Sequence, residues 1–163
     1  MCRGRNAGRA RTVYGRSRQH ESDPAGNEMG EHMAVTEELI TRVDFVGTPS
    51  TDLDRAVAFY GDTLGLRRSA YVPERNYAEF ETGNVTLSIY NPQAMGMEHH
   101  ANRNPIALHV ADMDAARAQL QELGVAFNGD TLDTGVCYMA FFQDPDGNAL
   151  MLHHRYAPRD PQG

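Results

Sequence analysis

The sequence predicts an α+β fold built from two β-α-β-β-β modules in tandem. The same order of short apolar segments and helix signals occurs twice between residues 42 and 157. Two short motifs also repeat at nearly constant offsets. Asp52-Leu53-Asp54-Arg55-Ala56 matches Asp112-Met113-Asp114-Ala115-Ala116 at an offset of 60, and Leu64-Gly65-Leu66 matches Leu123-Gly124-Val125 at 59. The chain of 163 residues is long enough for one domain that contains both modules.

The first module spans residues 42–92. A short strand over 43–46 precedes a helix over 52–64. Asp52 can cap the free N–H groups at the start of this helix, and Gly65 ends it. Three strands follow, and Pro73 and the tight-turn pair Gly83-Asn84 separate them. We expect these strands over residues 69–72, 77–82 and 85–90.

A polar connector over residues 91–104 leads to the second module, residues 105–157. The connector contains His99-His100, for which we expect a solvated loop. The second helix begins at Asp112 and ends at Gly124. The strands of this module are expected over residues 106–110, 125–128, 137–142 and 149–153. The turn Asp144-Pro145-Asp146-Gly147 joins the last two.

Charge is unevenly distributed along the chain. Six arginines lie in the first 18 residues, and residues 21–163 hold nine arginines against 22 acids, a formal charge of −13. An acidic body repels phosphates, so we expect no nucleic-acid partner. Residues 1–40 lack apolar periodicity and are expected to form a disordered, arginine-rich extension. Met29 or Met33 could replace Met1 as the start of translation. Residues 159–163 form a tail after the domain at 41–158.

Apolar runs and cysteine content indicate in which cellular compartment the protein is expected. No apolar run approaches the length of a membrane span, and no apolar stretch follows the N-terminal arginines as in a signal peptide. Cys2 and Cys137 are too few for a disulfide framework, and Cys137 is expected to pack as a small apolar side chain. We therefore expect a cytoplasmic protein with no membrane partner.

Deletion of residues 1–40 tests the predicted extension. The melting temperature should change by no more than about two degrees, because a segment without a packed apolar face adds little stability. Thermal unfolding of the shortened and full chains measures this. A drop of about ten degrees would show that the segment packs on the domain.

Two motifs, in this order, resemble the vicinal oxygen chelate superfamily, which includes glyoxalase I, bleomycin-resistance proteins, fosfomycin-resistance enzymes and extradiol dioxygenases. They are the helix segment 52–60 with Leu64-Gly65-Leu66, and the turn 142–148. The resemblance implies a cupped eight-stranded half-barrel with helices outside, a ligand cleft inside and a tendency to dimerise. One fold supports many reactions, so the resemblance does not fix the chemistry.

Enzymes of that superfamily hold a divalent metal with four side chains, usually His, Gln or Glu. Carried over by position, the resemblance places these ligands at Phe45, Thr86 or Ser88, Pro105 and Met151. Phe and Pro have no side-chain donor, and Thr and Met are poor ligands for hard divalent ions. We therefore expect no cofactor at the inherited position. A divalent metal could bind only at a displaced site.

Strand alternation selects the side chains that face the cleft. Besides Phe45 and Met151, they are Thr86, Ser88 and Tyr90 on the fourth strand and Glu79 and Glu81 on the third. His109 and His153 also face it. These histidines with the two glutamates could form the displaced metal site, or the histidines could act as general acid and base. Alternatively, the histidines bond backbone carbonyls and the glutamates reach solvent.

Three functions remain open from the sequence. The missing ligands favour a protein that binds a small organic molecule over an apolar floor of Phe45, Pro105 and Met151. The alternative is a metal-dependent lyase, isomerase or dioxygenase in which His109 and His153 are catalytic. A module with only an assembly role is the third. The expected partners are a small-molecule ligand or substrate and a second copy of the chain.

Overall fold

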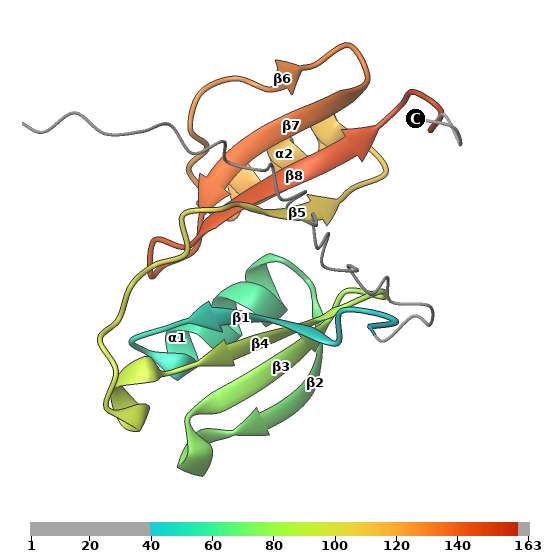
Figure 1. Ribbon diagram of the computed structural model, residues 1–163. Helices are drawn as coiled ribbons and strands as arrows, with labels where there is room; N and C mark the ends of the chain where they lie inside the picture. The colour runs from blue at the N-terminus through green and yellow to red at the C-terminus, as the bar shows by residue number, and fades with distance from the viewer. Residues whose placement is uncertain (1–39, 160–163) are drawn as a thin grey trace, which may run out of the picture. The chain divides into compact units, whose positions relative to one another are not determined.

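The computed structural model describes residues 40–159, which form two four-stranded sheets, each with one α-helix across one face (Figure 1). Sheet A contains β1 (Phe45–Pro49), β2 (Arg67–Val72), β3 (Tyr77–Glu81) and β4 (Thr86–Tyr90), and its helix is α1 (Leu53–Ala58). Sheet B contains β5 (Ile106–His109), β6 (Leu132–Asp133), β7 (Cys137–Gln143) and β8 (Ala149–Arg155), and its helix is α2 (Met113–Glu122). The predicted extension over residues 1–40 and the tail at 159–163 fall almost wholly outside the described residues.

The two sheets have the same topology. The strand order is β1-β4-β3-β2 in sheet A and β5-β8-β7-β6 in sheet B. In each sheet the first strand runs parallel to the last, and the other neighbours are antiparallel. This confirms the tandem β-α-β-β-β prediction. Over residues 40–159 the strands form two separate sheets and do not close into a barrel.

Both helices begin where the sequence predicts. The Asp52 carboxylate accepts a hydrogen bond from the Arg55 amide at 3.1 Å, and Asp112 accepts one from the Ala115 amide at 2.9 Å. The first helix differs in its second half, because α1 continues as a π-helical turn, η1 (Phe59–Thr63), in which the Leu64 amide donates to the Phe59 carbonyl. The predicted helical span of 52–64 is confirmed, but the expectation of regular α-helix throughout it is wrong.

The strand predicted over 125–128 is also wrong. Only Phe127 forms a bridge there, to Phe142, and the sixth strand is instead the two-residue β6. The reason is local: the Val125 amide closes the end of α2 on the Leu120 carbonyl, and Gly129 turns the chain away with φ of +81°. Between the end of α2 and the turn at Gly129, the chain is extended for only long enough to form this one bridge.

The first strand begins later than predicted and runs through Pro49. Because β1 lies at the edge of sheet A, a residue without an N–H group can occupy it without removing a bond from the ladder. Two short 3₁₀ turns, η2 (Pro73–Arg75) and η3 (Pro92–Met95), follow β2 and β4.

Alternate residues of the central strands form the core beneath the helices. The buried residues of sheet A are Ala78, Phe80, Leu87 and Ile89, which have no exposed surface. Those of sheet B are Ala140, Phe142, Leu150 and Leu152, which are at most 3% exposed. This confirms the predicted inward positions on the fourth and eighth strands and fixes which residues face the other way. Among residues 40–159, neither α-helix has the length and apolar character needed to cross a bilayer.

The turn between β7 and β8 joins the two modules through a buried carboxylate. Asp144 accepts hydrogen bonds from the Tyr60 hydroxyl at 2.8 Å, from the Asp146 and Asn148 amides at 2.9 and 2.8 Å, and from Asn148 Nδ2 at 2.7 Å. Asn148 Nδ2 also donates to the Pro49 carbonyl at 2.8 Å. Burial, followed by the charge of Asp144, raises the pKa of Tyr60 well above its usual value, so the phenol remains a donor.

A second carboxylate of the same turn holds the segment that leads into α1. Asp146, whose side chain is 1% exposed, accepts bonds from the Ser50 and Thr51 hydroxyls at 2.7 and 2.6 Å and from the Thr51 amide at 3.0 Å. Arg55 Nη2 lies 2.8 Å from the same carboxylate. Burial alone would raise the pKa of Asp146, but these hydrogen bonds and the Arg55 charge outweigh it and lower that pKa.

Replacing Tyr60 by Phe tests the first of these contacts. The variant should lose roughly 1–3 kcal/mol of unfolding free energy, because the buried Asp144 carboxylate loses one donor. Urea denaturation measures the loss. Tyr71→Phe is the matched control, since its hydroxyl bonds Asp54 at an exposed position and its removal should cost far less. Equal losses in the two variants would contradict the assignment.

The lowered pKa of Asp146 predicts a loss of stability in acid. The unfolded state takes up this proton at a higher pH than the folded state does, so the contribution is present above the ordinary aspartate pKa of about 4 and disappears as pH falls below it. Urea unfolding at a series of pH values should show a shallower acid loss for Asp146→Asn than for the natural chain. Parallel curves would exclude a contribution from this carboxylate.

Candidate functional site

The face of sheet A turned away from α1 carries most of the predicted ligand-binding residues in register. Phe45, Thr86 and Glu81 are partners across β1, β4 and β3, and the Thr86 hydroxyl lies 3.3–3.4 Å from the Glu81 carboxylate oxygens. Ser88 pairs with Glu79 in the next row. The structure therefore brings these five side chains onto one continuous face.

An aromatic ring lies along the same face. Tyr90 pairs with Tyr77 and Pro49, and its ring lies over Gly47, where a Cβ atom would be 3.1 Å from Tyr90 Cε1. Phe45 is 64% exposed. The face thus combines exposed aromatic surface with two carboxylates, Glu81 in the row of Phe45 and Glu79 in the next row.

The corresponding face of sheet B is more apolar. Met151 pairs with Ala107 on β5 and with Phe141 on β7. His153 pairs in the same way with His109 and Met139. Met139 and Phe141 were not among the predicted site residues, although their alternation with the buried Ala140 and Phe142 is the signal that would have selected them.

The backbones of His109 and His153 are paired, but the ring of His109 contacts a different histidine. His109 and His153 are register partners on adjacent strands. The ring of His109 lies near that of His154, with centroids 6.3 Å apart and planes 20° apart. His154 Nδ1 is 2.9 Å from the Val110 carbonyl oxygen, so it donates this bond and leaves Nε2 as an acceptor in the neutral ring.

The donor set does not fit a divalent metal. Within residues 40–159, no three His, Cys, Asp or Glu side chains gather closely enough to hold an ion. Glu79 and Glu81 belong to sheet A, whereas His109 and His153 belong to sheet B. At the positions that the resemblance assigns to ligands, Phe45 and Thr86 are register partners and Met151 lies on β8. These side chains offer at best a hydroxyl and a thioether.

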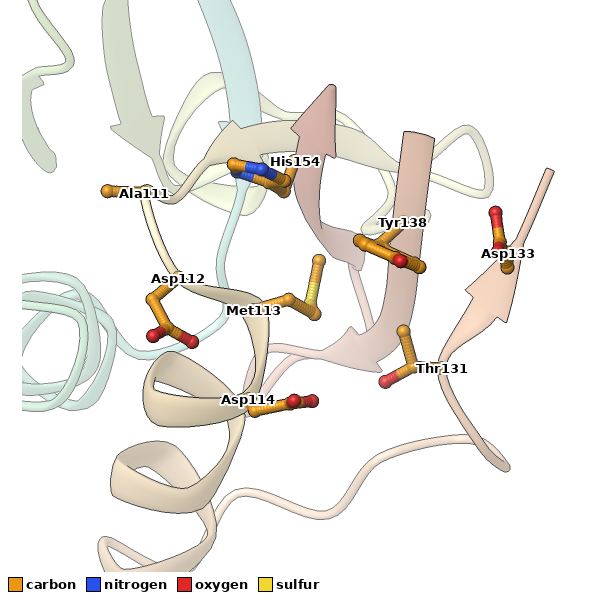
Figure 2. Close-up of a pocket in the computed structure, with 8 residues that line it drawn as sticks. All are labelled: Ala111, Asp112, Met113, Asp114, Thr131, Asp133, Tyr138 and His154. Atoms are coloured by element: carbon orange, nitrogen blue, oxygen red, sulfur yellow. The ribbon is translucent and has the colours of Figure 1, made fainter. Parts of the chain in front are cut away.

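A pocket that the sequence did not predict lies at the start of α2, on the helix side of sheet B (Figure 2). Its volume is about 430 Å³. The rings of Tyr138 and His154 are nearly parallel, with centroids 6.4 Å apart, and Met113 lies between them and the helix in Figure 2. The remaining lining residues are Ala111, Asp112, Asp114, Thr131 and Asp133.

The carboxylate of Asp133, which lines this pocket, accepts a hydrogen bond from a neighbouring tyrosine. The Tyr156 hydroxyl donates to it at 2.7 Å, and this bond, with one from the Gly135 amide, lowers the pKa of Asp133. The same hydrogen bond raises the pKa of Tyr156 to about 12. The carboxylate is thus held ionised beside the aromatic pair.

Comparison with known proteins gives a consistent result. A profile of the Glyoxalase/Bleomycin resistance protein/Dioxygenase superfamily matches residues 42–152. A lactoylglutathione lyase of Haemophilus influenzae is 33% identical over 107 residues, covering 59% of this chain and 79% of that protein.

Two solved structures are similar over most of their length. TnmS3, an antibiotic binding protein from Streptomyces sp. CB03234, has a TM-score of 0.63 and 29% identity, with 73% of this chain and 99% of that one covered. A putative glyoxalase family protein from Bacillus anthracis has a TM-score of 0.63 and 22% identity, with 73% and 98% covered. The second likeness concerns the fold alone.

Proposed function

Because the chain belongs to the Glyoxalase/Bleomycin resistance protein/Dioxygenase superfamily, we propose that it binds a small organic molecule on the open faces of its two sheets, without a metal at the inherited position. The observation that carries this proposal is the chemistry of the four ligand positions. Phe45, Pro105 and Met151 replace donors with apolar groups. Residues 40–159 also contain no group of three ligating side chains that could substitute for them.

The residues on these faces favour a planar ligand with a positive charge. Phe45 and Tyr90 offer aromatic surface on sheet A, and Phe141 and Met151 offer apolar surface on sheet B. Glu79 and Glu81 have no cationic partner among the salt bridges of residues 40–159, so they remain available to an amine. The similarity to an antibiotic binding protein supports a role in sequestering such a compound.

The same faces support a homodimer. Each is covered on one side only, by its own helix, and Phe45 and Val43 remain 64% and 62% exposed. A second copy of the chain would shield these side chains and enclose the ligand. The proposed compartment is the cytoplasm, where the buried free thiol of Cys137 stays reduced.

Phe45→Ala tests the binding function directly. With 9-aminoacridine, a planar aromatic cation, as the fluorescent probe, the variant should bind more weakly by roughly 1–3 kcal/mol, the scale of a lost buried aromatic contact. Glu79→Gln should reduce the preference for this probe over uncharged acridine. Leu123→Ala is the matched control, because Leu123 is an exposed apolar residue at the end of α2, on the helix side of sheet B and away from the open sheet faces. Equal affinity in all variants would refute the proposed site.

A second candidate function is a metal-dependent lyase, isomerase or dioxygenase. It is favoured by the register pairing of His109 with His153 and by the similarity to a lactoylglutathione lyase. In that case His109→Gln or His153→Gln should lower turnover by about two decades or more, the usual effect of removing a general acid or base, with binding nearly unchanged. If the protein is a binder, His109→Gln should leave affinity for the probe unaltered.

A further inference from the structure

A separate cavity lies where the two modules meet on the helix side of the sheets. Its walls come from the end of η1 and the following turn in the first module, and from β5, α2 and β8 in the second. Its volume is about 240 Å³. The apolar walls are Leu64, Leu66, Leu108, Val110, Leu120 and Leu152. Of the residues predicted to face the cleft, only His109 lines it.

The polar residues of this cavity lie on its solvent side. Asp62, His109 and Gln119 are exposed, as is Leu123, whereas the other leucines that line the cavity are half-buried or buried. Ala116 faces the same space from α2, and its methyl group leaves room that a larger side chain would occupy. The cavity therefore has an apolar interior and a few hydrogen-bonding groups at its opening.

The first-module wall is formed by an unusual backbone element. The π-helical turn η1 ends at Thr63, and the Leu64 and Leu66 amides donate to the Phe59 and Tyr60 carbonyls at 2.9 and 3.0 Å. A π-helical turn is less favourable than regular α-helix and is found frequently at functional sites. Here it widens the end of the first helix at the point where the cavity opens.

We infer that this junction cavity is a second binding site, for a small uncharged ring compound with one hydrogen-bonding group. Leucine and valine walls offer water few partners, and an apolar cavity of about 150 Å³ is known to take up benzene. The larger volume here matches a bicyclic ring such as indole. A polar group on the ring would reach His109, Gln119 or Asp62. Such a ligand contacts both modules, so its binding stabilises their junction.

Indole is a suitable probe, because the chain contains no tryptophan and indole emission can be followed alone. Transfer from water into the cavity should shift this emission to shorter wavelength and raise the melting temperature of the protein. Ala116→Phe fills the cavity and should weaken indole binding at least tenfold. Ala118→Phe, on the exposed face of the same helix, is the matched control and should bind as the natural chain does.

Two further variants test for a folding defect in Ala116→Phe and for indole binding at the sheet faces. Ala116→Leu is a smaller change, to be used if Ala116→Phe does not fold, and it should raise the melting temperature of the free protein while weakening indole binding. Phe45→Ala alters the proposed sheet-face site and should leave indole binding unchanged. The inference is overturned if indole does not bind, if Ala116→Leu binds it as well as the control, or if Phe45→Ala is the variant that abolishes binding.

Discussion

The carboxylate of Asp144 is the contact on which the arrangement of the two modules depends. It lies in the β7–β8 turn of the second module and accepts the hydroxyl proton of Tyr60, which is fully buried in the first. Asn148 and Asp146 of the same turn bond Pro49, Ser50 and Thr51. One five-residue turn therefore fixes the end of β1 and the start of α1. Because a buried carboxylate without donors is costly, each of these donors helps to hold the turn against the first module.

This scaffold does not depend on the side chains at the ligand positions that the family resemblance assigns. The positions that superfamily enzymes use for ligands lie on the open sheet faces, whereas the contacts of Asp144 and Asn148 lie on the buried side. Phe45 and Met151 at these positions lie outside the fully buried core, so the packing of the core does not depend on them. One scaffold can therefore serve catalysis or the binding of an organic ligand, and binding is the function proposed for this chain.

Helix starts and strand faces could be predicted from the sequence, whereas details of the local backbone and long-range contacts could not. Asp52 and Asp112 identified both helix starts because a cap acts over three residues, and alternation identified the faces of β4 and β8. The π-helical turn at Phe59 and the short β6 are local features that the apolar pattern does not distinguish, and the bond from Tyr60 to Asp144 joins residues 84 positions apart. For the candidate site, register explains why Phe45, Thr86 and Glu81 form one row, but the contact of His109 with His154 needed the structure.

The central claim is that the open sheet faces bind an organic ligand and hold no metal. Elemental analysis of protein purified without chelator tests this most directly. The account predicts well below one equivalent of divalent metal per chain, in His109→Gln and His153→Gln variants as in the natural protein. About one tightly held metal per chain, retained through desalting and lost in either histidine variant, would contradict it and identify a displaced metal site.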